Sequence, residues 1–157
     1  MSARPLALAA VVIGTVALLL APPARSADEA AGHDDMKSLG GRWERALTPK
    51  DVESHGGSRA VKEMNGSRET VTYFDESGQP VYATAADFKL EAAGPVRIYT
   101  YSNLKVKQAK DGGTEAPTGN VSYIYKVEGD QYYEAHGLLT TSPAGAKPRV
   151  VEWKRIK

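Results

Sequence analysis

The chain of 157 residues carries 20 basic and 19 acidic side chains and has no cysteine. Its length favours a single domain, which must be held by its own core because no disulfide can form. The near-zero net charge argues against a nucleic-acid-binding protein, since such proteins present a strongly basic surface to phosphates.

Residues 1–26 have the parts of an export signal. A basic start precedes the apolar run 6–20, and the small residues Ala24 and Ser26 predict cleavage before Ala27. An uncleaved anchor is the alternative, but the run falls short of the roughly 20 residues that a membrane-spanning helix needs. We therefore expect an exported protein, periplasmic or secreted, with no membrane segment after cleavage.

A lead and a short helical turn are expected at 27–40, ahead of a barrel that spans 41–157. Asp34 or Asp35 can cap a turn that ends near Leu39, because a carboxylate there accepts the unpaired amide hydrogens of the first turn. The glycine pair that follows ends the turn and leads into the first strand.

The segment 48–57 predicts a second short helix, between the first two strands. Thr48 would be the N-cap, Pro49 lies where its missing N–H is harmless, and Asp51 occupies the capping-box position. Two glycines at 56–57 would end this helix, which could cover one mouth of a barrel. An ordinary surface turn is the alternative.

The rest of the chain consists of short segments in which apolar and polar residues alternate, joined by turns. Strands are expected at 41–47, 60–64, 68–74, 81–91, 96–104, 120–128, 131–139 and 149–156. The polar segment 105–119, with two glycines and a proline, is expected to be a loop. The predicted fold class is all-β, an antiparallel up-and-down barrel of about eight strands, with a two-sheet sandwich as the alternative.

The Asn-Gly pair at 65–66 predicts a two-residue hairpin turn, because both central residues need positive φ. In that register Glu63 lies opposite Arg68, and Lys62 lies opposite Glu69. Both pairs have opposite charges, which favours this pairing of the two strands.

A second hairpin turns at Gly129 and Asp130. Side-chain alternation puts eight residues on one face of it: Val121, Tyr123, Tyr125, Val127, Tyr132, Glu134, His136 and Leu138. The other face is more polar, so we expect the aromatic face to point into the barrel. Glu134 and His136 would then lie inside, each beside a tyrosine.

Tyr123, Tyr125, Glu134 and His136 are the candidate ligand-binding residues. A buried charge is costly unless it is hydrogen-bonded, so Tyr125 is expected to donate to Glu134, and Tyr123 to pair with His136. Together these residues would form a polar patch that orients a small ligand in an otherwise apolar lumen. The alternative is a core network in which the four residues satisfy only one another.

Arg97, Tyr99 and Tyr101 share a face of the strand that begins at Val96. If that face pointed inward, Arg97 could hold a carboxylate. Val96 and Ile98 compete for the interior and are favoured there, which makes Arg97 a solvated or rim residue.

The motif Gly41-x-Trp43 within 35–43 resembles the opening of small exported lipocalin-like (calycin) domains of the planctomycete type, and the ending 151–155 is similar to theirs. The resemblance implies a barrel in which a late arginine lies across the first-strand tryptophan and closes one end. Trp43 and Arg155 occupy the matching positions, and their implied role is structural. A cation over an indole ring contributes about 0.5–2 kcal/mol.

The expected function is the binding of a small, largely apolar ligand in the lumen of a monomeric barrel. The alternatives are a periplasmic protein-binding module such as a protease inhibitor, with 27–39 as its trunk, and a packed barrel without a ligand. No metal or cofactor is expected, because neither His33 nor His55 has three or four converging ligands around it. An enzyme is not expected either, since nucleophile-elbow and phosphate-loop motifs are absent.

Overall fold

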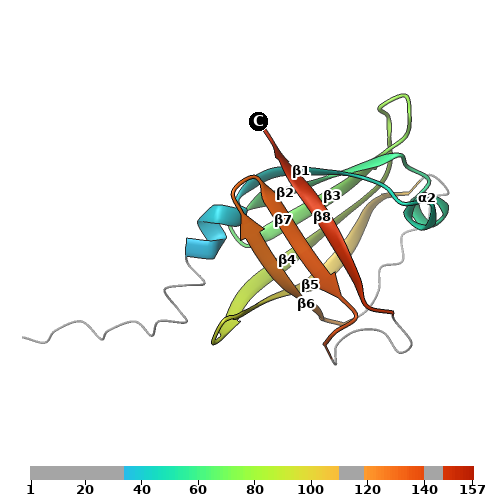
Figure 1. The fold of residues 1–157 in the computed structure, drawn as a ribbon. Coiled ribbons are helices and arrows are strands. Elements are labelled where there is room, and N and C mark those ends of the chain that lie inside the picture. The colour runs from blue at the N-terminus through green and yellow to red at the C-terminus, as the bar shows by residue number, and fades with distance from the viewer. Residues whose placement is uncertain (1–33, 110–118, 140–146) are drawn as a thin grey trace, which may run out of the picture.

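The computed structural model describes residues 34–109, 119–139 and 147–157, so the expected signal segment and most of the expected lead lie outside it. In the described part, eight antiparallel strands close into a barrel in sequence order, and the last strand pairs with the first (Figure 1). The predicted up-and-down barrel is confirmed, and the two-sheet sandwich does not hold. The described helices include none with the length and apolar character of a membrane span.

The element bounds are β1 Gly41–Ala46, α2 Pro49–His55, β2 Arg59–Asn65, β3 Arg68–Phe74, β4 Pro80–Ala93, β5 Val96–Ala109, β6 Val121–Glu128, β7 Gln131–His136 and β8 Arg149–Ile156. A short helix at 34–39 precedes β1. Strand β5 continues to Ala109, so the prediction of a loop from residue 105 was wrong for its first part; residues 110–118 lie outside the described residues.

The helix at 34–39 and α2 lie at opposite ends of the barrel (Figure 1). For α2 the predicted capping is confirmed: Thr48 accepts from the amide of Asp51, and the Asp51 side chain accepts from the amide of Thr48. Gly56 ends the helix at φ 74°, a left-handed conformation that glycine adopts without strain.

Trp43 closes the end of the barrel next to the helix at 34–39. The side chain is fully buried, and its Nε1 donates to the carbonyl of Leu39 at 2.7 Å. The guanidinium carbon of Arg155 lies 4.0 Å from the indole centroid, while its nitrogens donate to the carbonyls of Gly40, at 2.8 Å, and Ser38. The structure thus has the contact that the family resemblance implied.

The core continues inward from Trp43 as a set of aromatic rings. Phe88, Tyr99 and Tyr123 stack in a row across β4, β5 and β6, with ring centroids 4.6 and 4.7 Å apart. Tyr132 lies 5.5 Å from Trp43 on the other side of the interior. These rings fill the half of the barrel next to the helix at 34–39, so an interior space can remain only towards α2.

The register of the β2–β3 hairpin differs from the prediction. Asn65 pairs with Arg68, which makes Gly66 and Ser67 the central residues, and Lys62 lies opposite Val71 rather than Glu69. The reason is that Gly66 takes the positive φ, 57°, whereas Asn65 stays in the strand. The two registers keep the same residues on each face, so Glu69 remains on the face of Lys62.

The inward face of β5 was also predicted wrongly. Tyr99 is fully buried, whereas Val96 is 38% exposed, so the tyrosine face points inward. The physical reason is that rings of tyrosine size fill the interior and stack on their neighbours, which a valine cannot do. Arg97 lies near the rim, where its Nε is 3.0 Å from Asp35.

Candidate functional site

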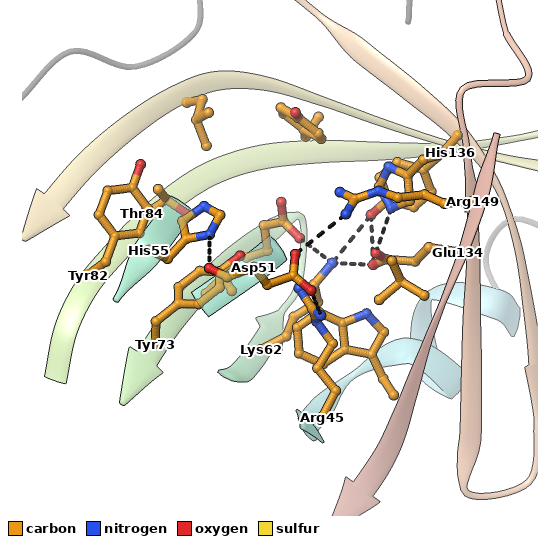
Figure 2. A pocket seen from close by; sticks show the side chains of 17 residues that line it. Arg45, Asp51, His55, Lys62, Tyr73, Tyr82, Thr84, Glu134, His136 and Arg149 are labelled. Carbon is orange, nitrogen blue, oxygen red and sulfur yellow. Dashed lines mark hydrogen bonds and ion pairs between the residues drawn. The ribbon is translucent and has the colours of Figure 1, made fainter. Parts of the chain in front are cut away.

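A cavity of about 260 Å³ lies inside the barrel at the end covered by α2, and Asp51 and His55 of this helix belong to its lining (Figure 2). It is lined by tyrosines, a few aliphatic side chains and an unusual number of charges. Besides two histidines, the lining contains six acidic or basic residues: Arg45, Asp51, Lys62, Glu69, Glu134 and Arg149. The lumen is therefore more polar than expected.

Strand alternation and register explain how these side chains reach the cavity. The inward residues run from the floor to the mouth as Glu69, Val71 and Tyr73 on β3, as Tyr132, Glu134 and His136 on β7, and as Trp153, Val151 and Arg149 on β8. Because β3 starts and β8 ends at the same end of the barrel, Glu69 lies deep and Arg149 lies near α2.

Lys62 is the centre of the cavity floor. Its ammonium contacts Oε1 of Glu134 and lies 3.3 Å from Oε2 of Glu69, and all three side chains are at most 7% exposed. Burial alone would lower the pKa of Lys62, but the two carboxylates raise it above its ordinary value. Burial would likewise raise the pKa of Glu134, but Lys62 and His136 hold it well below its usual range. Lys62 and Glu134 therefore stay ionised, and Lys62 is not a nucleophile.

Aromatic rings surround the same ammonium. Its Nζ lies 5.0 Å from the centroid of Trp153 and between 5.5 and 5.7 Å from those of Tyr132, Tyr99 and Tyr123. Cation–π attraction at such distances partly replaces the water that a buried ammonium loses. The floor is thus an ion cluster enclosed by rings.

The tyrosine hydroxyls complete this network. Tyr99 donates to Glu69 at 2.7 Å, and Tyr123 donates to Glu134 at 3.2 Å and contacts the hydroxyl of Tyr132 at the same distance. Burial, together with the neighbouring carboxylates, raises the pKa of Tyr99, Tyr123 and Tyr132. These phenols therefore stay neutral and act as hydrogen-bond donors.

His136 and Arg149 lie side by side above the floor, as directly opposed residues of β7 and β8 (Figure 2). One ring nitrogen of His136, Nε2, lies 3.0 Å from Glu134, and its ring centroid is 4.5 Å from that of Tyr123. Their side chains are 23% and 54% exposed, so they are more accessible than any charge on the floor.

Asp51 ties α2 across the mouth. Its carboxylate accepts from Arg45 at 2.9 Å and lies 3.4 Å from Arg149 (Figure 2). It also accepts from the hydroxyl of Thr48. Burial alone would raise the pKa of Asp51, but hydrogen bonds from Arg45 and Thr48 hold it well below its usual range. His55, one turn further, stacks on Tyr73 at 4.2 Å between centroids. The mouth is therefore covered by a helix that both charge and ring contacts hold down.

Replacing Asp51 with asparagine is expected to lower the free energy of unfolding at pH 7 by about 2 kcal/mol, because hydrogen bonds to a buried charge are lost. Since folding depresses the pKa of Asp51, its stabilisation is present above about pH 4 and is lost as the pH falls below that value. The variant should therefore lose less stability than the wild type between about pH 5 and 2. Urea unfolding at a series of pH values measures this.

The exposed variant Asp130→Asn serves as the control and should follow the wild type at every pH, since its side chain is 73% exposed. Parallel pH curves for Asp51→Asn and the wild type would contradict the assignment of Asp51 as an ionised latch.

Of the four predicted ligand-binding residues, Tyr123, Glu134 and His136 line this cavity and Tyr125 does not. Tyr125 lies directly opposite Glu134 on the paired strand, yet its hydroxyl donates to Asp35 at 2.8 Å, so the expected bond to Glu134 was wrong. The helix at 34–39 brings Asp35 within reach of this phenol at the closed end.

Tyr123 and His136 do contact each other as expected, but through their rings. The hydroxyl of Tyr123 donates to Glu134 instead. Leu138 is 54% exposed, so the inward face of the hairpin ends before it.

The sequence reasoning did not include Lys62, Glu69, Arg45 or Asp51 in the site. A signal was present for Lys62, which shares a strand face with two apolar residues, Ala60 and Met64. A charge on an apolar face indicates a buried ion pair, and its partner Glu134 lies 72 residues away in the chain. Only the closed sheet brings the two together.

Comparisons with known proteins give no relative: no family model, no curated protein and no solved structure matches the chain. In the described ranges, no group of three or more His, Asp or Glu side chains is placed to hold a metal ion.

Proposed function

We propose that the protein is an exported binding protein that holds a small molecule in the lumen of its barrel. The cavity below α2 carries this proposal. Its volume of about 260 Å³ lies just under the roughly 300–1,000 Å³ of pockets for drug-sized ligands, so its ligand is small. The apolar run at the start of the chain, followed by small residues, supports export.

The lining favours a hydrogen-bonding ligand over the largely apolar one expected from the sequence. His136 and Arg149 offer accessible donors, and Tyr101, Tyr73 and Tyr82 offer ring faces. A ligand that combines polar groups with a compact apolar part matches such a lining. A purely apolar ligand would leave the polar groups of the mouth without compensation.

Binding is favoured over catalysis because the reactive groups of the floor are engaged with one another. Lys62 is held between two carboxylates, and the tyrosine hydroxyls donate to those carboxylates. A general acid or base needs a proton that can move to a substrate, and these groups are fixed in one protonation state.

Membership of the lipocalin-like class is part of this proposal. It is supported by the sequential closed barrel and by the guanidinium of Arg155 lying over the ring of Trp43. The inhibitor alternative is less well supported, since the helix at 34–39 is bound to the barrel through Ser38 and Asp35.

Native mass spectrometry of protein purified from its own host is expected to show a bound small molecule that is lost on unfolding. In the variant His136→Gln the fraction carrying it should fall about tenfold, which corresponds to one lost hydrogen bond to a charged or polar group. Glu152→Gln, on the outer face of β8, should retain the ligand as the wild type does.

Folded protein without any bound molecule would contradict the proposal and favour the packed barrel. A bound polypeptide would favour the inhibitor alternative.

A further inference from the structure

The charges of the cavity are distributed unevenly between its two ends. At the floor, two carboxylates, Glu69 and Glu134, share the single ammonium of Lys62. At the mouth, two guanidinium groups, Arg45 and Arg149, share the single carboxylate of Asp51. The floor therefore has an excess of negative charge and the mouth an excess of positive charge, although the six charges balance.

Glu69 is the carboxylate on the floor with free hydrogen-bonding capacity. Lys62 and Tyr99 both contact its Oε2, and Oε1 has no donor among the described residues. Glu134, by contrast, uses both oxygens, Oε1 with Lys62 and Oε2 with His136. The side chain of Glu69 is 93% buried and belongs to the cavity lining, so its Oε1 can accept a hydrogen bond from a donor group of a ligand in the cavity.

Arg149 is the guanidinium with free capacity at the mouth. Its one side-chain ion pair in the described residues is with Asp51, at 3.4 Å, whereas Arg45 is closer to the same carboxylate, at 2.9 Å. A guanidinium has five N–H donors in a planar fork, and most of those on Arg149 remain available. His136, directly opposite, adds a ring to the same corner.

Ring faces lie between the two ends. Tyr101 belongs to the lining and is not among the rings around the ammonium of Lys62, and Tyr73 adds its ring nearer the mouth, where His55 stacks on one side of it. A compact carbon skeleton placed between Glu69 and Arg149 would be covered by these phenol rings.

We infer that the cavity takes a small zwitterion, with its ammonium group against Glu69 on the floor and its carboxylate against Arg149 at the mouth. The inference rests on the proposed binding function and names its ligand class. A simple cation would be attracted by the carboxylates of the floor but repelled by the excess of positive charge at the mouth. A simple anion would be attracted at the mouth but repelled at the floor. A zwitterion matches both ends and leaves the charge balance of the cavity unchanged.

Three probes with the same phenyl ring test this inference: 4-(aminomethyl)benzoate, which has one charge at each end, benzylamine, which has only the ammonium, and benzoate, which has only the carboxylate. Isothermal titration calorimetry on the protein from the whole expressed chain is expected to show 4-(aminomethyl)benzoate binding about tenfold more tightly than either analogue. Equal binding of the three, tighter binding of an analogue, or binding of none would overturn the inference.

Charge-removing variants assign each end. Glu69→Gln should weaken the binding of 4-(aminomethyl)benzoate about tenfold and leave that of benzoate unaffected. Arg149→Gln should weaken the binding of 4-(aminomethyl)benzoate and leave that of benzylamine unaffected. The matched controls are Glu63→Gln and Arg42→Gln, an outer-face pair whose side chains are 56% and 54% exposed. Binding of 4-(aminomethyl)benzoate that both cavity variants leave intact would also overturn the inference.

Native mass spectrometry separates failure of this inference from failure of the proposed function. A retained molecule without opposite charges would leave the binding function standing and end the zwitterion inference. Protein that carries no molecule and binds none of the probes would contradict both the binding function and the zwitterion inference.

Discussion

Lys62→Met is expected to lower the free energy of unfolding at pH 7 by about 3–5 kcal/mol, because it leaves two carboxylates buried without their shared cation. The wild type loses stability as the pH falls below about 4, since folding depresses the pKa of Glu134. The variant should show the opposite trend between pH 7 and about 5, because one buried carboxylate now takes up a proton on folding. Urea unfolding followed by circular dichroism measures both effects.

Two further variants separate the loss of charge pairing from the loss of a side chain. The triple variant Lys62→Met, Glu69→Gln, Glu134→Gln should recover most of the stability, because no unpaired charge remains in the barrel. Lys89→Met, whose side chain is 62% exposed, should stay within about 0.5 kcal/mol of the wild type. If Lys62→Met behaved like Lys89→Met, the cluster would not be the buried charge centre that the structure describes.

Trp43→Ala is expected to destabilise the protein by about 3–5 kcal/mol, the range for removal of a large buried ring. The indole is fully buried, bonds to the carbonyl of Leu39 and lies under Arg155, so its loss uncovers the closed end of the barrel. Chemical unfolding gives the value. Trp43→Phe should lower the free energy of unfolding by less, since it keeps a ring and loses only the N–H donor and part of the buried apolar area.

A double-mutant cycle with Arg155→Ala tests whether the two residues act together. A coupling of about 0.5–2 kcal/mol is expected between Trp43 and Arg155 from the cation–π contact. Strict additivity of the two substitutions would mean that the stacked geometry adds nothing beyond the separate contacts.

The fold could be predicted from the sequence where short-range signals are strong. The Thr48–Asp51 capping box, the turn at 129–130 and the strand alternation around Tyr123 depend only on neighbouring residues, and the structure has all three. The Asn-Gly signal was less decisive, since either Gly66 or Asn65 can be the first central residue of a two-residue turn.

The site was harder to predict because its members come from separate strands. Tyr123, Glu134 and His136 share one hairpin and were found together, whereas Lys62 and Glu69 belong to the other side of the barrel. A lysine is ordinarily placed outside, so its burial becomes reasonable only once two carboxylates and four rings are known to surround it. The prediction of the inward face of β5 was wrong for a related reason. Which face points inward depends on which side chains fill the volume left inside the barrel by the other strands.

The two tryptophans of the chain have different surroundings. Trp153 lines the cavity with the ammonium of Lys62 and the guanidinium of Arg45 each 5.0 Å from its ring, whereas Trp43 lies in the packed half under Arg155. The emission of each indole responds to the charges and water around it. The molecule thus contains one intrinsic fluorophore beside the space where a ligand would bind and a second one at the closed end, diagonally across the paired strands β1 and β8.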